Sequence, residues 1–103
     1  MVKITKAIAE ERLADVPQEK RFWCSDRRVL KNLSELEAVL KEMSEETFCY
    51  HSNEARSDFS NWVRDVIGDE KLSRDLQKST TRAQAAKSVA GRIAWLKSKR
   101  EAG

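Results

Sequence analysis

The chain has 103 residues, of which 40% are hydrophobic and 36% charged, and its formal net charge is +3. This length suits one domain, and the composition is more charged than that of an average globular domain without being that of a disordered chain. It contains no apolar run near the roughly 20 residues that cross a bilayer, and its first residues lack the apolar core of a signal peptide. We therefore expect a cytoplasmic protein that does not engage a membrane.

Charge is distributed unevenly along the chain. Residues 32–70 carry ten acidic and three basic side chains, whereas residues 71–103 carry nine basic and two acidic ones. A basic tail is typical of a face that meets nucleic acid or an acidic partner. The alternative is that the acidic and basic segments pack against each other with complementary charge.

Residues 1–18 are expected to form an N-terminal arm or a short helix, because Ile4, Ala7 and Ile8 have helical spacing and Pro17 prevents continuation. Residues 19–100 are expected to form one compact helical domain. Within it, the alternation around Trp23 predicts a minor β-hairpin at residues 22–30, which is stable only if it packs on helices.

Further helices are predicted at residues 32–43, 44–52, 58–67, 69–79 and 81–100. Each has inward-facing apolar residues at helical spacing or a polar residue suited to cap its start. In the third, Phe59, Trp62, Val63, Val66 and Ile67 form one stripe. Gly68 stands where a left-handed helix end belongs, and Asp69 can cap the next helix. The fold class is therefore mainly α, an irregular bundle of four to five helices with a minor hairpin.

The only histidine, His51, lies close to Cys49 and Asp58 and is the first candidate for chemistry. Two helical residues two positions apart point about 200° apart, so Cys49 and His51 cannot share a metal. Two cysteines are also too few for a disulfide framework, so we expect Cys24 and Cys49 to be free thiols. A nucleophilic cysteine with His51 as base has no supporting motif. We expect no metal, no cofactor and no catalytic residue.

His51, Asn53 and Asp58 are better interpreted as a structural polar corner between two helices. Their side chains can satisfy helix-end backbone groups, and His51 can donate a hydrogen bond to Asp58 or to a backbone carbonyl. A small-ligand binder or an enzyme around Tyr50, His51 and Asp58 remains an alternative.

The second candidate is Trp95, which lies off the apolar stripe of the last predicted helix. Its neighbours on that side are Ser88, Gly91, Arg92 and Lys99. Small residues beneath a tryptophan, with cations beside it, favour a partner-binding patch, a homodimer contact or a base-stacking surface. Packing on the N-terminal arm or on Trp23 is the alternative.

The basic residues of the last predicted helix spread around it. Arg82, Lys87, Arg92 and Lys97 are spaced by five, whereas a groove-binding helix concentrates its cations on one face. Nucleic-acid binding through this helix is therefore an alternative to a protein partner or homodimer, and the less favoured one.

Residues Tyr50–His51 and Asp58–Asp69 together resemble a family of small archaeal and bacterial domains of uncharacterised function. The shared pattern is an aromatic residue and His, then Asp-Phe-x-x-Trp-Val, and then Asp-Val-x-Gly-Asp. Two departures are Arg27, where the family pattern has a turn glycine, and Ser57, where it has Asn. The resemblance covers roughly residues 22–96. It implies a compact, mostly helical domain that is often appended to other proteins, and it implies no activity. We expect a non-enzymatic interaction or regulatory module.

Overall fold

The structure, a computed structural model, describes residues 4–101, and its fold is mainly α as the sequence predicts. The elements run α1 (Lys6–Leu13), the 3₁₀ turn η1 (Gln18–Lys20), β1 (Phe22–Trp23), β2 (Val29–Leu30), α2 (Leu33–Glu42), α3 (Glu45–His51), α4 (Asp58–Trp62), the π-helical turn η2 (Val63–Ile67), α5 (Glu70–Lys78) and α6 (Arg82–Glu101). The described residues thus contain six α-helices, namely the five predicted between residues 32 and 100 and α1 in the N-terminal segment, for which an arm or a short helix was predicted.

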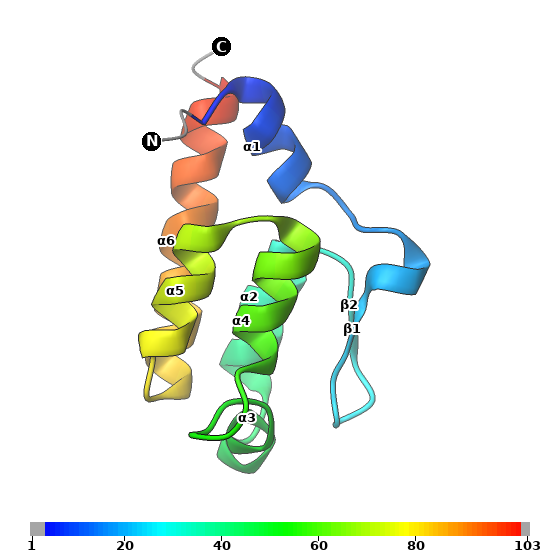
Figure 1. Cartoon of the computed structure of the whole chain (residues 1–103), viewed down its shortest axis with the longest axis vertical. Helices are drawn as coiled ribbons and strands as arrows, with labels where there is room; N and C mark the ends of the chain where they lie inside the picture. The colour runs from blue at the N-terminus through cyan, green and yellow to red at the C-terminus, as the bar shows by residue number, and fades with distance from the viewer. Residues whose placement is uncertain (1–3, 102–103) are drawn as a thin grey trace.

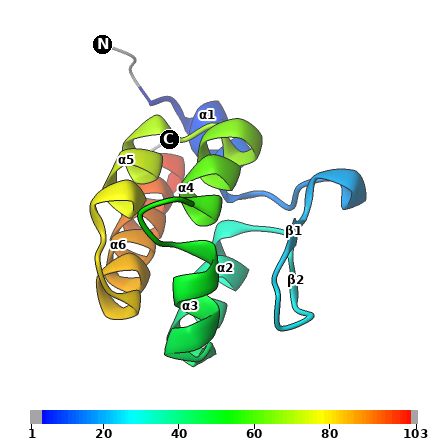
Figure 2. The same cartoon turned by 60° about the horizontal axis from the view of Figure 1, so that its bottom comes forward.

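The long helix α6 is the support for the bundle, and α1, α2 and α5 all pack against it (Figure 1). The hairpin stands on the side of α4 away from α6, which the turned view shows most clearly (Figure 2). One continuous apolar core fills the space between the helices, and Leu33, Leu36, Leu40, Val63, Leu72, Val89 and Leu96 are fully buried in it.

The helix starts follow the predicted capping pattern, with one exception. The side chains of Asn32, Ser44 and Asp69 accept hydrogen bonds from backbone N–H groups of the first turns of α2, α3 and α5. Ser57 occupies the N-cap position of α4, but its side chain makes no capping hydrogen bond. Asp58, the first residue of α4, uses its carboxylate for contacts described below.

The predicted helix over residues 58–67 changes character after Trp62. The N–H groups of Gly68 and Asp69 both donate to the carbonyl of Val63, at 2.8 and 3.2 Å, which widens the last turn. Gly68 then adopts φ of 83°, the left-handed conformation that ends many helices. This ending aims Asp69 toward the core, where its carboxylate is fully buried.

The hairpin forms as predicted, with Phe22 opposite Leu30 and Trp23 opposite Val29. Arg27 has φ of 75°, so an arginine adopts the left-handed conformation that glycine takes most readily. The hairpin is held by aromatic packing, because the ring of Phe22 lies 5.1 Å from that of Phe59 and 6.0 Å from that of Trp62. Two strands of this length would be marginal without such support.

Candidate functional site

Trp95 lies on α6 and is 37% exposed, an unusual state for a large aromatic residue in a small domain. The guanidinium of Arg92 stacks over its ring at 4.2 Å from the centroid, and the ammonium of Lys99 lies at 5.3 Å. These cation–π contacts orient the indole and leave part of its surface in contact with solvent. The structure therefore brings together three of the five residues predicted for partner binding.

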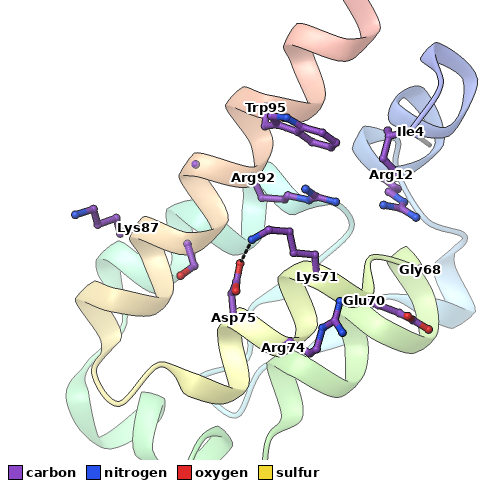
Figure 3. A pocket seen from close by; sticks show the side chains of 12 residues that line it. Ile4, Arg12, Gly68, Glu70, Lys71, Arg74, Asp75, Lys87, Arg92 and Trp95 are labelled. Carbon is purple, nitrogen blue, oxygen red and sulfur yellow. Dashed lines mark hydrogen bonds and ion pairs between the residues drawn. The ribbon is translucent and has the colours of Figure 1, made fainter. Parts of the chain in front are cut away.

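Trp95 lines a pocket between α1, α5 and α6, which we call the Trp95 pocket; its volume is about 1210 Å³. Its lining residues are Ile4, Arg12, Gly68, Glu70, Lys71, Arg74, Asp75, Lys87, Ser88, Gly91, Arg92 and Trp95. Figure 3 shows Trp95 and Arg92 projecting from α6 toward Ile4 and Arg12. The predicted residues Ser88 and Gly91 belong to this lining as well, whereas Lys99 does not. The N-terminal arm, expected as an alternative packing site for Trp95, does contribute Ile4 and Arg12 to this pocket, whereas Trp23 lines a different one and the contribution of α5 was not predicted.

An ion cluster at one end of the Trp95 pocket holds Arg92 in place. Oδ2 of Asp69 accepts a hydrogen bond from Nε of Arg92 at 2.7 Å and lies 3.6 Å from a guanidinium nitrogen of Arg12. The side chains of Arg92 and Arg12 are only 10% and 16% exposed. Arg92 is therefore a fixed support for Trp95, a role that spacing along α6 did not indicate.

The remaining charges of the Trp95 pocket are mostly positive and exposed. Asp75 is paired with Lys71 at 2.8 Å, whereas Arg74 and Lys87 make no ion pair within residues 4–101. Five basic and two acidic side chains line the pocket. Its electrostatic field therefore favours an anionic partner.

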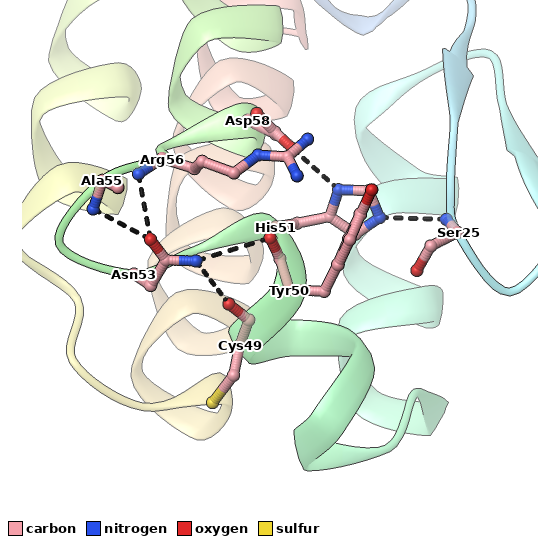
Figure 4. A network of polar contacts seen from close by, with 8 residues as sticks. All are labelled: Ser25, Cys49, Tyr50, His51, Asn53, Ala55, Arg56 and Asp58. Atoms are coloured by element: carbon pink, nitrogen blue, oxygen red, sulfur yellow. Dashed lines mark hydrogen bonds and ion pairs between the residues drawn. The ribbon is translucent and has the colours of Figure 1, made fainter.

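His51 is 4% exposed, and both of its ring nitrogens are engaged (Figure 4). Nε2 accepts a hydrogen bond from the backbone N–H of Ser25 at 2.9 Å, and Nδ1 lies 2.9 Å from Oδ2 of Asp58. Because Nε2 accepts, the proton of the neutral ring must be on Nδ1, from which it is donated to Asp58. The expected contact between His51 and Asp58 is present, and the link to the hairpin was not foreseen.

Asn53 lies in the same corner, and its side chain makes hydrogen bonds to the backbone of α3 and of the connector between α3 and α4. Its amide nitrogen donates to the carbonyl of Cys49 at 2.8 Å, and its Oδ1 accepts from the N–H of Ala55 at the same distance. Asp58 also accepts from Arg56 at 2.8 Å. His51, Asn53 and Asp58 form a polar corner, which we call the histidine corner, and it joins α3, α4 and the hairpin. Both imidazole nitrogens of His51 already have hydrogen-bond partners and are not free to contact a substrate.

Cys24 and Cys49 are free thiols that lie in different environments. Burial of Cys24 against the core raises its thiol pKa above the ordinary value, whereas Cys49 is exposed. Across residues 4–101, no three His, Cys, Asp or Glu side chains stand close enough together to hold a metal ion. Nor does any helix in this part of the chain have the length and apolarity needed to span a membrane.

Comparison with known proteins gives no match to a family model, to a curated protein or to a solved structure. The function must therefore be argued from the geometry of the Trp95 pocket and of the histidine corner.

Proposed function

We propose that this chain is a non-enzymatic interaction module and that the Trp95 pocket is its partner-binding face. The observation that carries the proposal is the partial exposure of Trp95 in a pocket built from three helices. Tryptophan and arginine dominate the energetics of protein interfaces, particularly where a pocket excludes water around them. The resemblance to domains that are appended to other proteins also supports this function.

The chemistry of the Trp95 pocket indicates which partner it fits. A volume of about 1210 Å³ exceeds that of most small-molecule sites, which suits a peptide segment. Arg74 and Lys87 supply cations to its lining that make no ion pair within residues 4–101. The partner is therefore an acidic segment of another protein that places an apolar side chain against Trp95.

The test is affinity capture with two matched double variants. Trp95→Ser with Lys87→Glu alters the Trp95 pocket, whereas Trp23→Ser with Lys97→Glu makes the same exchanges at exposed positions outside it. We expect a bound protein to be lost with the first variant and kept with the second, and to cross-link through Lys71 or Lys87. Equal capture by both variants would contradict the proposal.

Nucleic-acid binding is the second candidate, because Arg74 and Lys87, which make no ion pair within residues 4–101, share a pocket with the partly exposed indole of Trp95. Labelled single-stranded DNA and RNA should bind weakly and release steeply as salt increases. Affinity that survives moderate salt and falls with Trp95→Ser would establish nucleic acid as the ligand in place of a protein. Sedimentation of the wild type and the Trp95→Ser variant tests whether a second copy of the chain occupies the pocket.

A further inference from the structure

A second pocket lies between the hairpin and the helices α3 and α4, and we call it the hairpin pocket. Its volume is about 420 Å³, within the range of small-molecule sites. It shares no lining residue with the Trp95 pocket. Four of its lining residues carry the inference, namely Arg21, Trp23, Tyr50 and Arg56.

Arg21 contributes a buried hydrogen-bond donor that has no acceptor within residues 4–101. Its Nε is buried and has no hydrogen-bond partner among the described residues. A buried donor in this state destabilises a protein, because it loses its hydrogen bond to water and gains none in return. The chain cannot easily withdraw it, because Trp62 Nε1 donates to the carbonyl of Lys20 at 2.8 Å just before it and Phe22 packs on Phe59 just after it. The residue as a whole is only partly buried and lines the pocket, so a rotation of its side chain would bring this donor to an anion bound there.

Two aromatic side chains that line the same pocket lie outside the hydrophobic core. Trp23 is 69% exposed and Tyr50 is 52% exposed. The guanidinium of Arg56 lies 4.5 Å from the centroid of the Tyr50 ring and donates to Asp58 at 2.8 Å. The pocket therefore offers flat apolar surfaces next to two guanidinium groups.

We propose that the hairpin pocket binds a nucleoside monophosphate, with the base stacked on Trp23 or Tyr50 and the phosphate held by Arg21 and Arg56. Guanidinium groups match the oxygen geometry of phosphate, and aromatic side chains stack on any base. The acidic group nearest to this site, Asp58, is already paired with His51 and Arg56. Both nitrogens of His51 are engaged by Ser25 and Asp58, so the proposed contacts to the ligand come from the arginines and the aromatic rings.

The test uses adenosine monophosphate, adenosine and inorganic phosphate as separate probes, followed by amide NMR shifts and tryptophan fluorescence. We expect the monophosphate to bind most tightly and to shift the signals of residues 21–25 and 50–58. Trp23→Ala and Arg21→Gln should each weaken it about tenfold, in line with the loss of one stacked base or one charge-assisted contact. Arg64→Gln, an equal charge change at an exposed position outside this pocket, should leave binding unchanged.

Arg21→Met provides a readout that does not depend on the ligand. Because methionine places an apolar atom where the buried Nε has no partner, the variant should melt at or above the temperature of the wild type while binding less. The proposal would be overturned if adenosine monophosphate bound no more tightly than adenosine or inorganic phosphate. Amide NMR shifts confined to residues of the Trp95 pocket would also overturn the proposal for the hairpin pocket, but they would not contradict the proposed interaction function.

Discussion

Asp69 and Arg92 form a buried ion pair, in which Oδ2 of Asp69 accepts from Nε of Arg92 at 2.7 Å. The other carboxylate oxygen accepts from the N–H of Leu72 at 3.1 Å and so caps α5. Arg12 of α1 approaches the same carboxylate at 3.6 Å. A single fully buried carboxylate therefore connects α1, α5 and α6, and the wall of the Trp95 pocket depends on it.

Asp69→Asn should destabilise the protein by about 3–5 kcal/mol, because it leaves two largely buried guanidinium groups without their counter-charge. Urea unfolding followed by circular dichroism measures the change. The matched control is Asp75→Asn, which removes a partly exposed carboxylate paired with Lys71 and should cost less than about 1 kcal/mol. Equal losses of unfolding free energy in the two variants would show that the buried ion pair contributes no more to stability than the partly exposed one.

Trp62→Ala should destabilise the protein by about 3–5 kcal/mol, the range for truncating a buried aromatic side chain. Trp62 is 7% exposed, and its Nε1 donates to the carbonyl of Lys20, so it links α4 to the segment that precedes the hairpin. Trp62→Phe should recover most of the stability and lose about 1 kcal/mol for the hydrogen bond. Trp23→Ala serves as the control, since Trp23 is 69% exposed. A thermal melt unchanged by Trp62→Ala would contradict this role.

Much of the fold follows from the local sequence pattern, and the segment from α4 to Gly68 shows what that pattern does not predict. The stripe from Phe59 to Ile67 correctly predicts a buried helical face, and Gly68 correctly marks its end. Helical periodicity does not distinguish an α-turn from the π-turn after Trp62. The π-turn depends on hydrogen bonds that two N–H groups make to the carbonyl of Val63, together with packing by distant helices.

The pockets were less predictable because they are assembled from segments far apart in the sequence. Position on α6 identified Trp95 together with Ser88 and Gly91, but nothing in that helix reveals that Arg12 shares a carboxylate with Arg92. The acidic and basic segments do meet in part, since Arg82 pairs with Glu45 at 3.0 Å. Uneven charge along the chain left such pairing open as an alternative to a partner-binding face, and it did not show which residues would pair.

His51 should be a neutral imidazole with its proton on Nδ1, because the N–H of Ser25 donates to Nε2. Long-range nitrogen–proton NMR spectra distinguish this tautomer from the other. His51→Ala should cost about 2–5 kcal/mol, since the ring also packs against Phe22 and Phe59 at 5.2 and 5.3 Å. Tyr50→Ala, at the adjacent but exposed position, should cost far less. A proton found on Nε2 at neutral pH would contradict the contact with Ser25.

The two thiols should react at very different rates with an alkylating reagent at neutral pH. Burial raises the pKa of Cys24, so its reactive thiolate is scarcer than in the unfolded chain, and the reagent cannot easily reach it. Mass spectrometry should therefore show Cys49 modified first and Cys24 only on unfolding. Because the folded state raises this pKa, stability should fall as pH rises through the ordinary thiol pKa, and Cys24→Ala should reduce that alkaline loss. Rapid modification of Cys24 in the folded protein would contradict its burial.

Two glycines should respond in opposite ways to substitution by alanine. Gly91 is exposed within α6, and a Cβ there would meet no atom within 4 Å, so Gly91→Ala should stabilise the protein by about 0.5–1 kcal/mol. Gly68 has equally open space but adopts φ of 83°, so Gly68→Ala should destabilise it by about 1–2 kcal/mol. Urea titrations of both variants give the comparison.

Gly91 also allows stability to be separated from binding, because it lines the Trp95 pocket. Gly91→Leu places a larger side chain in the lining of that pocket, and leucine is a stronger helix former than glycine. The variant should fold at least as stably as wild type and lose the captured partner, whereas Gly91→Ala should retain most of the binding. If Gly91→Leu binds the partner normally, the partner contacts a different surface, and the gain in stability would still confirm the helical geometry at this position.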